Sequence, residues 1–224
     1  MVPRICERGH NLKYSKVPEA TIRRLSRYSR CLEDIDQGGE KVVSSAQLAH
    51  RCAVNPAQVR KDLAYFGEFG IRGVGYYVKD LLNDIKRILG LNKEWKMGLI
   101  GVGNLGSALL SYKDFFKQNY KIVAAFDIDP PNVIGRVSEK LGKPVEVLHI
   151  GRLKDVVKER GIEIGIITTP PSEAQNVANL LVGAEVRGIL NFAPAHVTVP
   201  DGFMVRDVFF TAILDNLAYL LSSG

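Results

Sequence analysis

The chain has 224 residues, a length that is enough for two domains. Because 46% of the residues are hydrophobic and 24% are charged, we expect packed cores and no extensive disorder. Its three cysteines include no C-x-x-C pair and its four histidines show no metal-ligand spacing, so neither a disulfide framework nor a metal site is expected. It has no apolar run near the ~20 residues of a membrane span and no apolar signal core, so we expect a cytoplasmic protein without a membrane partner.

The net charge of +6 lies entirely in the first part of the chain. Residues 1–92 contain 16 Lys and Arg against 10 Asp and Glu, whereas residues 93–224 contain 14 of each class. A basic part joined to a neutral part indicates a polyanionic partner for the basic part.

The first predicted helix runs from Val17-Pro18 to about Ile35, after fifteen residues without a clear period. Beside its apolar stripe lies a row of basic residues, namely Arg23, Arg24, Arg27 and Arg30. Such a row either contacts phosphate groups or is a solvated helix face, and the sequence favours neither.

Two short helices with a brief break between them predict a helix-turn-helix. Ser44-x-x-Gln47 is a capping-box pattern for the first helix, and Asn55-Pro56 supplies the N-cap and first helical residue of the second. The second helix turns an apolar face inward, and the polar residues on its other side are Gln58, Arg60, Lys61 and Tyr65. These residues either reach base edges or phosphates in a major groove or form the surface of a small packing domain.

The glycine-rich stretch 67–77 predicts a tight β-hairpin, the wing of a winged helix, with Arg72 and Gly73 at its tip. The alternative is a plain linker loop. An amphipathic helix over 80–90 follows, and we place the domain boundary at 91–93.

A G-x-G-x-x-G motif comes directly after the apolar strand 96–100, at Gly101, Gly103 and Gly106. The first glycine permits a sharp turn, the second a close approach to pyrophosphate, and the third tight packing of helix on strand. A second strand, 122–126, ends on Asp127, about 20 residues past the last glycine, where an acid would hold the ribose hydroxyls of NAD and repel the 2′-phosphate of NADP. Asp129 is a second candidate for that role; the alternative is a glycine turn that binds nothing.

Strands and helices then alternate, which predicts a doubly wound parallel sheet. The expected strands are 96–100, 121–127, 145–148, 163–168, 188–192 and 203–207, and the expected helices are 104–117, 152–160 and 172–182. Ligands bind at the carboxyl ends of such strands, so the loops 168–171 and 191–194 should border the nicotinamide; both also fit simple Pro and Asn turns. The final helix, 209–224, is apolar on nearly every side and is either a dimerisation element, exchanged between subunits, or docked on its own domain.

Five stretches of the chain match one family: Val17-Pro18-Glu19-Ala20-Thr21, Gln58 to Leu63, Gly70 with Arg72 to Tyr76, Gly101 to Leu109 with Tyr112, and Asn191 to Pro194. Together they resemble the Rex family of bacterial redox-sensing transcriptional repressors, over nearly the whole length from Val17. The resemblance implies a homodimer that binds a palindromic operator when free or with NAD⁺ and releases it when NADH binds.

The resemblance also implies roles for single residues. Arg60, Lys61 and Arg72 would contact DNA, Tyr112 would lie near the nicotinamide, and Arg30 would take part in an interdomain switch. Relatives carry an Asp just before the last helix, where this chain has Phe209. Asp207, two residues earlier and on the same face of a strand, is the expected substitute.

Two other classes of protein were weighed against this interpretation. An NAD-dependent oxidoreductase needs a substrate domain, but only some 16 residues remain after the sheet, and no acid/base pair stands beside the nicotinamide loops, so we expect no enzyme activity. A CoA-binding domain uses a similar glycine loop, but its 3′-phosphate would be disfavoured by Asp127.

The expected architecture is therefore α/β, with a winged helix-turn-helix over 16–92, a Rossmann-type sheet over 93–208 and a terminal helix over 209–224. The residues expected to bind the cofactor are Gly101, Val102, Gly103, Asn104, Leu105, Gly106, Tyr112, Asp127, Ile128, Thr168, Thr169, Pro170, Asn191, Phe192, Ala193 and Pro194. The residues expected to contact operator DNA are Arg23, Ser45, Gln58, Arg60, Lys61, Tyr65, Arg72 and Gly73, and those of the switch are Arg30, Tyr112 and Asp207.

Overall fold

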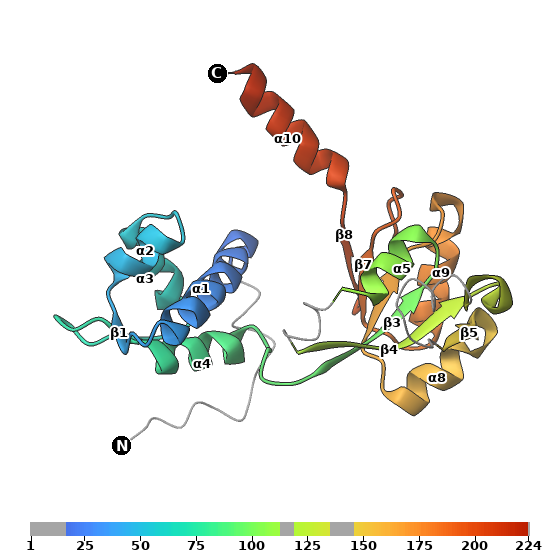
Figure 1. Cartoon of the computed structure of the whole chain (residues 1–224), viewed down its shortest axis with the longest axis horizontal. Helices are drawn as coiled ribbons and strands as arrows, with labels where there is room; N and C mark the ends of the chain where they lie inside the picture. Colours follow the sequence, from blue (N-terminus) through green and yellow to red (C-terminus); the bar gives the residue numbers. More distant parts are fainter. Residues whose placement is uncertain (1–16, 113–118, 135–145, 224) are drawn as a thin grey trace. The chain divides into compact units, whose positions relative to one another are not determined.

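The computed structural model describes residues 17–112, 119–134 and 146–223. The chain divides after Asn92 into two compact units, which are described separately below (Figure 1). The ends of two expected elements, the helix 104–117 and the strand 145–148, fall partly outside the described residues.

The first unit is a small helical bundle with a two-stranded sheet beside it (Figure 1). Its elements are α1 (Glu19–Gln37), β1 (Val42–Val43), α2 (Ser45–Arg51), α3 (Pro56–Ala64), β2 (Tyr76–Tyr77) and α4 (Val78–Ile88). One apolar cluster joins all four helices, and its fully buried members include Leu25, Leu32, Leu48, Val59 and Ile85. The helix-turn-helix is therefore held by a core of its own, and its apolar face is the one that the sequence predicts.

The local sequence rules explain where these helices begin. The Ser44 hydroxyl accepts a hydrogen bond from the Gln47 backbone N–H at 3.2 Å, and the Gln47 side chain accepts one from the Ser44 N–H at 2.8 Å, so the predicted capping box is confirmed. Asn55 Oδ1 accepts a bond from the Ala57 N–H at 2.7 Å, with Pro56 at the first helical position.

The wing differs from its expected form. Ile71 and Gly75 form a single antiparallel bridge around the tip, whereas the longer pairing joins Val42–Val43 to Tyr76–Tyr77. The second strand of the wing thus pairs with the segment before the helix-turn-helix. Gly75 (φ +109°) permits this close approach, because a Cβ there would lie 2.6 Å from the Val43 carbonyl oxygen. The helix α4 also starts at Val78, two residues before the expected position.

The second unit is built on a six-stranded parallel sheet in the order β5-β4-β3-β6-β7-β8, which confirms the predicted doubly wound topology. The strands are β3 (Trp95–Ile100), β4 (Tyr120–Asp127), β5 (Val147–His149), β6 (Ile164–Ile167), β7 (Gly188–Asn191) and β8 (Met204–Asp207). The order reverses between β3 and β6, so the loops after these two strands open at the switch point where ligands of such sheets bind.

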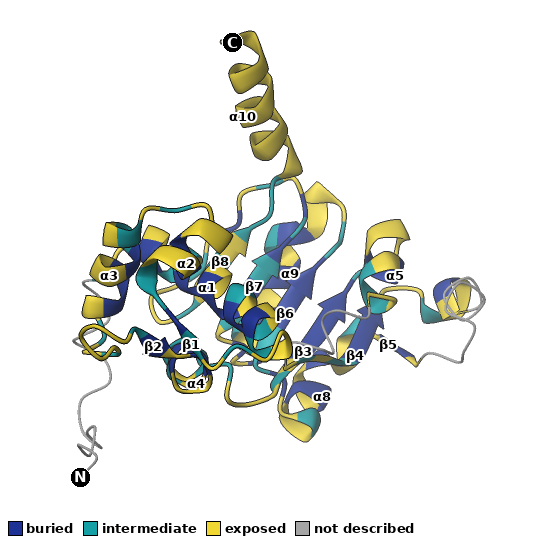
Figure 2. Cartoon of the chain, turned by 60° about the vertical axis from the view of Figure 1, so that its left-hand side comes forward, coloured by how far each residue is buried: buried dark blue, intermediate teal, exposed yellow. Residues whose placement is uncertain are grey.

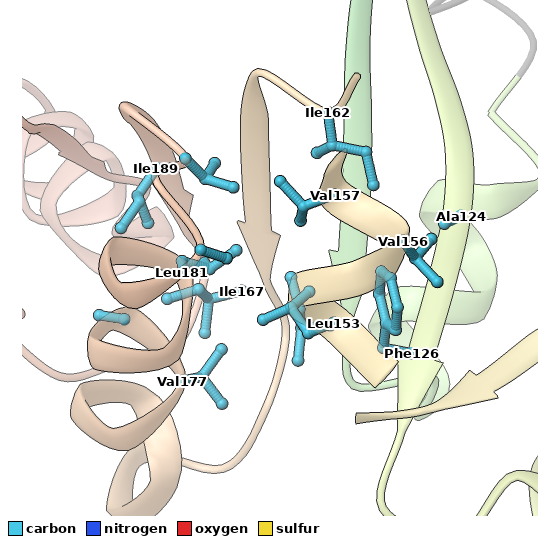
Figure 3. Packing of buried hydrophobic residues seen from close by; sticks show 14 of the residues in the cluster. Ala124, Phe126, Leu153, Val156, Val157, Ile162, Ile167, Val177, Leu181 and Ile189 are labelled. Carbon is cyan, nitrogen blue, oxygen red and sulfur yellow. The ribbon is translucent and has the colours of Figure 1, made fainter. Parts of the chain in front are cut away.

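Helices cover both faces of this sheet (Figure 1). α8 (Leu153–Arg160) and α9 (Pro171–Gly183) pack on one face, where Phe126, Ile167 and Leu181 are fully buried (Figure 3). α5 (Asn104–Leu110) borders the other face, where Leu99 and Ile166 are buried. Successive strand residues thus point to opposite layers, as a strand buried on both sides requires.

The final helix, α10 (Phe210–Ser222), buries none of its residues (Figure 2). An apolar stripe of exposed side chains runs along it, formed by Phe210, Ile213, Leu214, Leu217 and Leu221. Phe210, its first residue, contacts Phe192 of the same unit, with ring centroids 6.3 Å apart, while the side chains of the stripe remain exposed among the described residues. The described residues include no helix that is long and apolar enough to cross a membrane.

Candidate nucleotide-binding and DNA-binding sites

The three glycines after β3 have three different surroundings. Gly101 has φ +94°, and a Cβ there would lie 2.8 Å from Thr169 Cγ2. A Cβ on Gly106 would lie 2.1 Å from the Gly101 carbonyl oxygen, so α5 can approach the loop this closely only without a side chain. Gly103 has nothing within 4 Å of its Cβ position, which leaves open space at the start of α5. The first and third glycines thus shape the loop, while the second keeps its outer side clear for a ligand.

Asp127 lies directly beside this loop. Its Oδ2 accepts a hydrogen bond from the Val102 backbone N–H at 2.8 Å, and its Oδ1 accepts one from the Asp129 N–H at 3.1 Å. The Asp127 carboxylate therefore stabilises the glycine loop, a role that its spacing from the glycines does not predict. Both contacts are made by backbone donors, so the carboxylate retains acceptor sites for ribose hydroxyls. The Asp129 carboxylate accepts a hydrogen bond from the Asn132 side chain.

The loop after β6 closes on the same place. Thr168 Oγ1 donates to the Gly101 carbonyl at 2.7 Å, which ties the end of β6 to the turn after β3. Thr169 Oγ1 is the one buried side-chain polar atom without a partner among the described residues. A polar ligand group at this point would satisfy that hydroxyl, so the donors present fit a dinucleotide.

The loop 191–196 after β7 is fixed by a buried amide. Asn191 donates from Nδ2 to Asp207 Oδ1 and to the Ala195 carbonyl, both at 2.8 Å, and accepts the Ala193 N–H at 3.0 Å. Asn191 is fully buried. These hydrogen bonds hold the loop beside the carboxyl ends of the strands.

Asp207, expected in the switch, is already engaged inside its own unit. Besides Asn191 it contacts His196, whose Nδ1 lies 3.3 Å from Asp207 Oδ2, and its side chain is 18% exposed. β8 ends at Asp207, the Val208 N–H donates to the Asn191 carbonyl at 2.8 Å, and Phe209, the N-cap residue of α10, has an extended backbone. Tyr112, expected near the nicotinamide, is 51% exposed, and Ile128, expected to bind the cofactor, is 78% exposed.

In the first unit, the residue that organises the recognition helix is Asp62, which the sequence analysis did not single out. Its side chain is fully buried on α3 and accepts hydrogen bonds from Arg24, Tyr28 and Gln58 at 2.6–2.8 Å. Burial acts to raise the pKa of Asp62, but these donors outweigh it and hold the pKa below the ordinary value for an aspartate. The recognition helix is therefore anchored to α1 through a charged carboxylate.

This anchor changes the expected roles of two polar side chains. Gln58 Nε2 donates to Asp62 Oδ1 at 2.8 Å, so its amide is directed into the unit. Arg24, part of the basic row on the first helix, also turns inward, and its side chain is only 25% exposed. Arg27, in the same row, donates to the Cys52 carbonyl at 3.3 Å. The row is thus partly a packing surface between helices.

The remaining expected DNA contacts lie on the surface. Arg60 Nη1 donates to Ser45 Oγ at 3.0 Å, which brings the recognition helix and the start of α2 together. Lys61 and Arg72 are exposed, Tyr65 is 44% exposed, and Gly73 at the wing tip has φ +82° with nothing near its Cβ position. Arg30 is exposed as well, and Arg23 forms a salt bridge with Glu19 at 2.9 Å.

Two protein families match the two units. The family described as "Putative DNA-binding protein N-terminus" matches residues 16–64, and that described as "CoA binding domain" matches residues 92–195. The second match covers the part of the sheet unit that contains the glycine loop.

Characterised relatives match almost the whole chain. The redox-sensing transcriptional repressor Rex of Syntrophobacter fumaroxidans is 53% identical over 213 residues, which cover 95% of this chain and 100% of the relative. The protein of the same name from Solidesulfovibrio magneticus is 51% identical, over 94% of each chain.

Solved structures of RSP, a Rex-family repressor, are similar over both units. RSP in complex with beta-NAD⁺ and operator DNA is 36% identical with a TM-score of 0.84, over 92% of this chain and 93% of that one. RSP in complex with beta-NADH is 35% identical with a TM-score of 0.80, over 93% of this chain and 95% of that one.

Proposed function

Since this chain belongs to the Rex family of redox-sensing transcriptional repressors, we propose that residues 16–92 bind operator DNA and residues 93–208 bind NAD(H), with NADH releasing the DNA. The observation that carries the proposal is the glycine loop after β3. Its outer side is open at Gly103, a carboxylate at Asp127 braces it, and Thr169, in the loop after β6 beside Gly101, has a buried hydroxyl without a partner among the described residues. The protein acts as a repressor and catalyses no reaction.

The glycine loop would hold the pyrophosphate, and the carboxylate of Asp127 would hold the adenosine ribose. A negatively charged acceptor at this point would repel the 2′-phosphate of NADP, so the cofactor pair is NAD⁺ and NADH. CoA is disfavoured on the same ground. The loops 168–170 and 191–194 would border the nicotinamide, together with Tyr112.

The recognition helix α3 would enter the major groove of a palindromic operator. Arg60 and Lys61 would contact base edges or phosphates, with Ser45, Tyr65 and Arg23 beside them, and the wing tip at Arg72 and Gly73 would reach the minor groove. Gln58, being held by Asp62, would act by orienting the helix.

The signal would be the oxidation state of the nicotinamide ring, which is cationic in NAD⁺ and neutral in NADH. NAD⁺ and NADH would make the same contacts everywhere except at this ring. The equilibrium between the DNA-binding and the released form of the protein can therefore shift only if the two forms differ in their affinity for the ring. Arg30, Tyr112 and Asp207 are the residues proposed to transmit the change. Asp207 would do so by exchanging its partners, since Asn191 and His196 hold it in this structure.

Residues 209–224 would form the interface of a homodimer. The exposed apolar stripe of α10 is of the kind that is covered by a second subunit, and a dimer presents two recognition helices to the two halves of a palindrome. We place this repressor in the cytoplasm, where the operator DNA would be.

A gel-shift titration of the full-length protein on an operator-like palindromic fragment tests the proposal, with NADH and NAD⁺ added separately. NADH should release the fragment, whereas NAD⁺ should leave it bound. Arg60→Ala and Lys61→Ala should each weaken binding, while Lys79→Ala, an exposed lysine on α4, serves as the control. Retention that is indifferent to NADH would refute the coupling, and equal effects of all three variants would refute the role of α3.

A further inference from the structure

Two cysteine side chains meet inside the first unit, 21 residues apart in the chain. Cys52 Sγ lies 2.7 Å from Cys31 Sγ, and both are free thiols. Cys31 is on α1, and Cys52 is the C-cap residue of α2, directly before the turn into the recognition helix. The separation is about 0.7 Å longer than a disulfide bond, so a small movement of α2 toward α1 would bring the sulfurs to bonding distance.

The two thiols differ in their surroundings in a way that suits oxidation. Cys31 is half-buried, while Cys52 is only 2% exposed, so Cys31 is the thiol that would meet an oxidant first. Burial, and then the hydrogen bond to Cys31, raise the pKa of the Cys52 thiol, which keeps its proton and directs it to Cys31 Sγ. The guanidinium of Arg27, which donates to the Cys52 carbonyl, places a positive charge beside the pair.

We propose that Cys31 and Cys52 are a redox-modification site, at which a hydroperoxide forms an intramolecular disulfide that braces α2 and the helix-turn-helix against α1. This site goes beyond the NAD(H) sensing proposed above, because it responds to an oxidant in the first unit alone and needs no nucleotide.

The reaction balances with one hydroperoxide for each pair of thiols. The Cys31 sulfur loses its proton and attacks one peroxide oxygen, and the O–O bond breaks. With hydrogen peroxide, Cys31 becomes a sulfenic acid, and the departing hydroxide takes up the Cys31 proton to give the first water. Cys52 sulfur then attacks Cys31 sulfur, its proton passes to the departing hydroxyl, and water is released. Two thiols and one hydrogen peroxide thus give one disulfide and two waters.

The bond would brace the unit without displacing the recognition helix. α3 is anchored on α1 through Asp62, which accepts hydrogen bonds from Arg24 and Tyr28 and none from either thiol. A disulfide between residues 21 positions apart lowers the conformational entropy of the unfolded chain. The melting temperature of the oxidised protein should therefore lie at least about 5 °C above that of the reduced protein. Operator affinity should change by less than about threefold.

The test uses the full-length protein carrying Cys6→Ser, which removes the cysteine outside the described residues. The reduced protein is treated with hydrogen peroxide, unfolded in N-ethylmaleimide, and analysed by intact mass and peptide mapping. Loss of two hydrogens, absence of alkylation and recovery of both thiols with dithiothreitol are expected. Cys31→Ser and Cys52→Ala should each abolish that product. The melting temperature and the operator affinity by gel shift are then measured for the reduced and for the oxidised protein.

Each remaining outcome overturns the proposal. Two alkylated thiols after treatment, or a Cys31 that stops at a sulfinic acid, would show that the pair does not form a disulfide. A disulfide that leaves the melting temperature unchanged, or that abolishes operator binding, would show that it is no brace.

Discussion

Arg24 donates two hydrogen bonds to the Asp62 carboxylate, from Nε to Oδ2 at 2.6 Å and from Nη2 to Oδ1 at 2.7 Å. The carboxylate is fully buried on the recognition helix and the guanidinium comes from α1, 38 residues earlier in the chain. A planar guanidinium fixes both the distance and the angle of its partner, so this pair sets the orientation of α3 on the unit. The exposed Arg60 and Lys61 project from a helix whose rear side is held in place.

Replacing Asp62 by asparagine should destabilise the first unit. The substitution leaves Arg24 without its counter-charge and turns an amide N–H₂ toward donors, and removing one partner of a buried pair typically costs about 3–5 kcal/mol. Urea denaturation followed by circular dichroism measures the change, and Asp34→Asn, on the exposed side of α1, is the control. Equal stability of the two variants would mean that the pair contributes nothing.

The same carboxylate predicts how stability changes in acid. The pKa of Asp62 is lowered in the folded protein, so its contribution is complete above the unfolded pKa of about 3.9 and is lost as the pH falls through the lower, folded value. The difference in unfolding free energy between the native protein and Asp62→Asn should therefore be largest at neutral pH and shrink below about pH 4. Denaturation at a series of pH values checks this, and a constant difference would contradict it.

Two glycines of the nucleotide loop should respond in opposite ways to an added methyl group. Gly106→Ala places a Cβ 2.1 Å from the Gly101 carbonyl oxygen and should cost about 3 kcal/mol or more of stability. Gly103→Ala meets nothing within 4 Å and has an ordinary φ of −76°, so the fold should remain while NADH affinity falls at least about tenfold. Melting curves and NADH fluorescence titrations separate the two effects, and a Gly103→Ala protein with unchanged affinity would place the pyrophosphate elsewhere.

Asp127→Asn should relax the preference for NADH over NADPH. Asparagine can still accept the Val102 N–H, so the loop keeps its brace, while the negative charge that would repel a 2′-phosphate is gone. We expect the ratio of the two affinities to fall by about tenfold in titrations with each nucleotide. Asp201→Asn, an exposed acid outside the site, is the control, and an unchanged ratio in Asp127→Asn would refute the ribose role.

Charges on the apolar stripe of α10 should separate the proposed dimer. Ile213→Asp with Leu217→Asp places two carboxylates, one turn apart, among exposed apolar side chains. Sedimentation velocity should show a monomer, whereas Ala212→Asp with Asn216→Asp, an exposed pair with the same spacing on the opposite side of the helix, should leave the dimer intact. A dimer that survives the first pair would mean that its interface lies on another surface.

Local sequence patterns determined where several helices begin, where the glycine loop lies and how the sheet is built. The capping box at Ser44, the Asn55-Pro56 start of α3 and the glycine spacing after β3 depend on residues at most a few positions apart, so the sequence predicts them directly. Alternating strand and helix patterns determined the parallel sheet for the same reason. Helix ends were less accurate: α1 continues two residues past Ile35, to Gln37.

Only the tertiary structure decided which polar groups meet. Asp62 reads as an exposed residue in a helical pattern, and its partners lie up to 38 residues away on another helix. Asn191 faces Asp207 because β7 and β8 pair in that register, and Cys31 reaches Cys52 because α1 packs across the end of α2. Hydrogen bonds and thiol contacts require atoms within about 3 Å of each other. Residues far apart in the sequence come that close only when the helices and strands pack, so the sequence alone does not show these pairs.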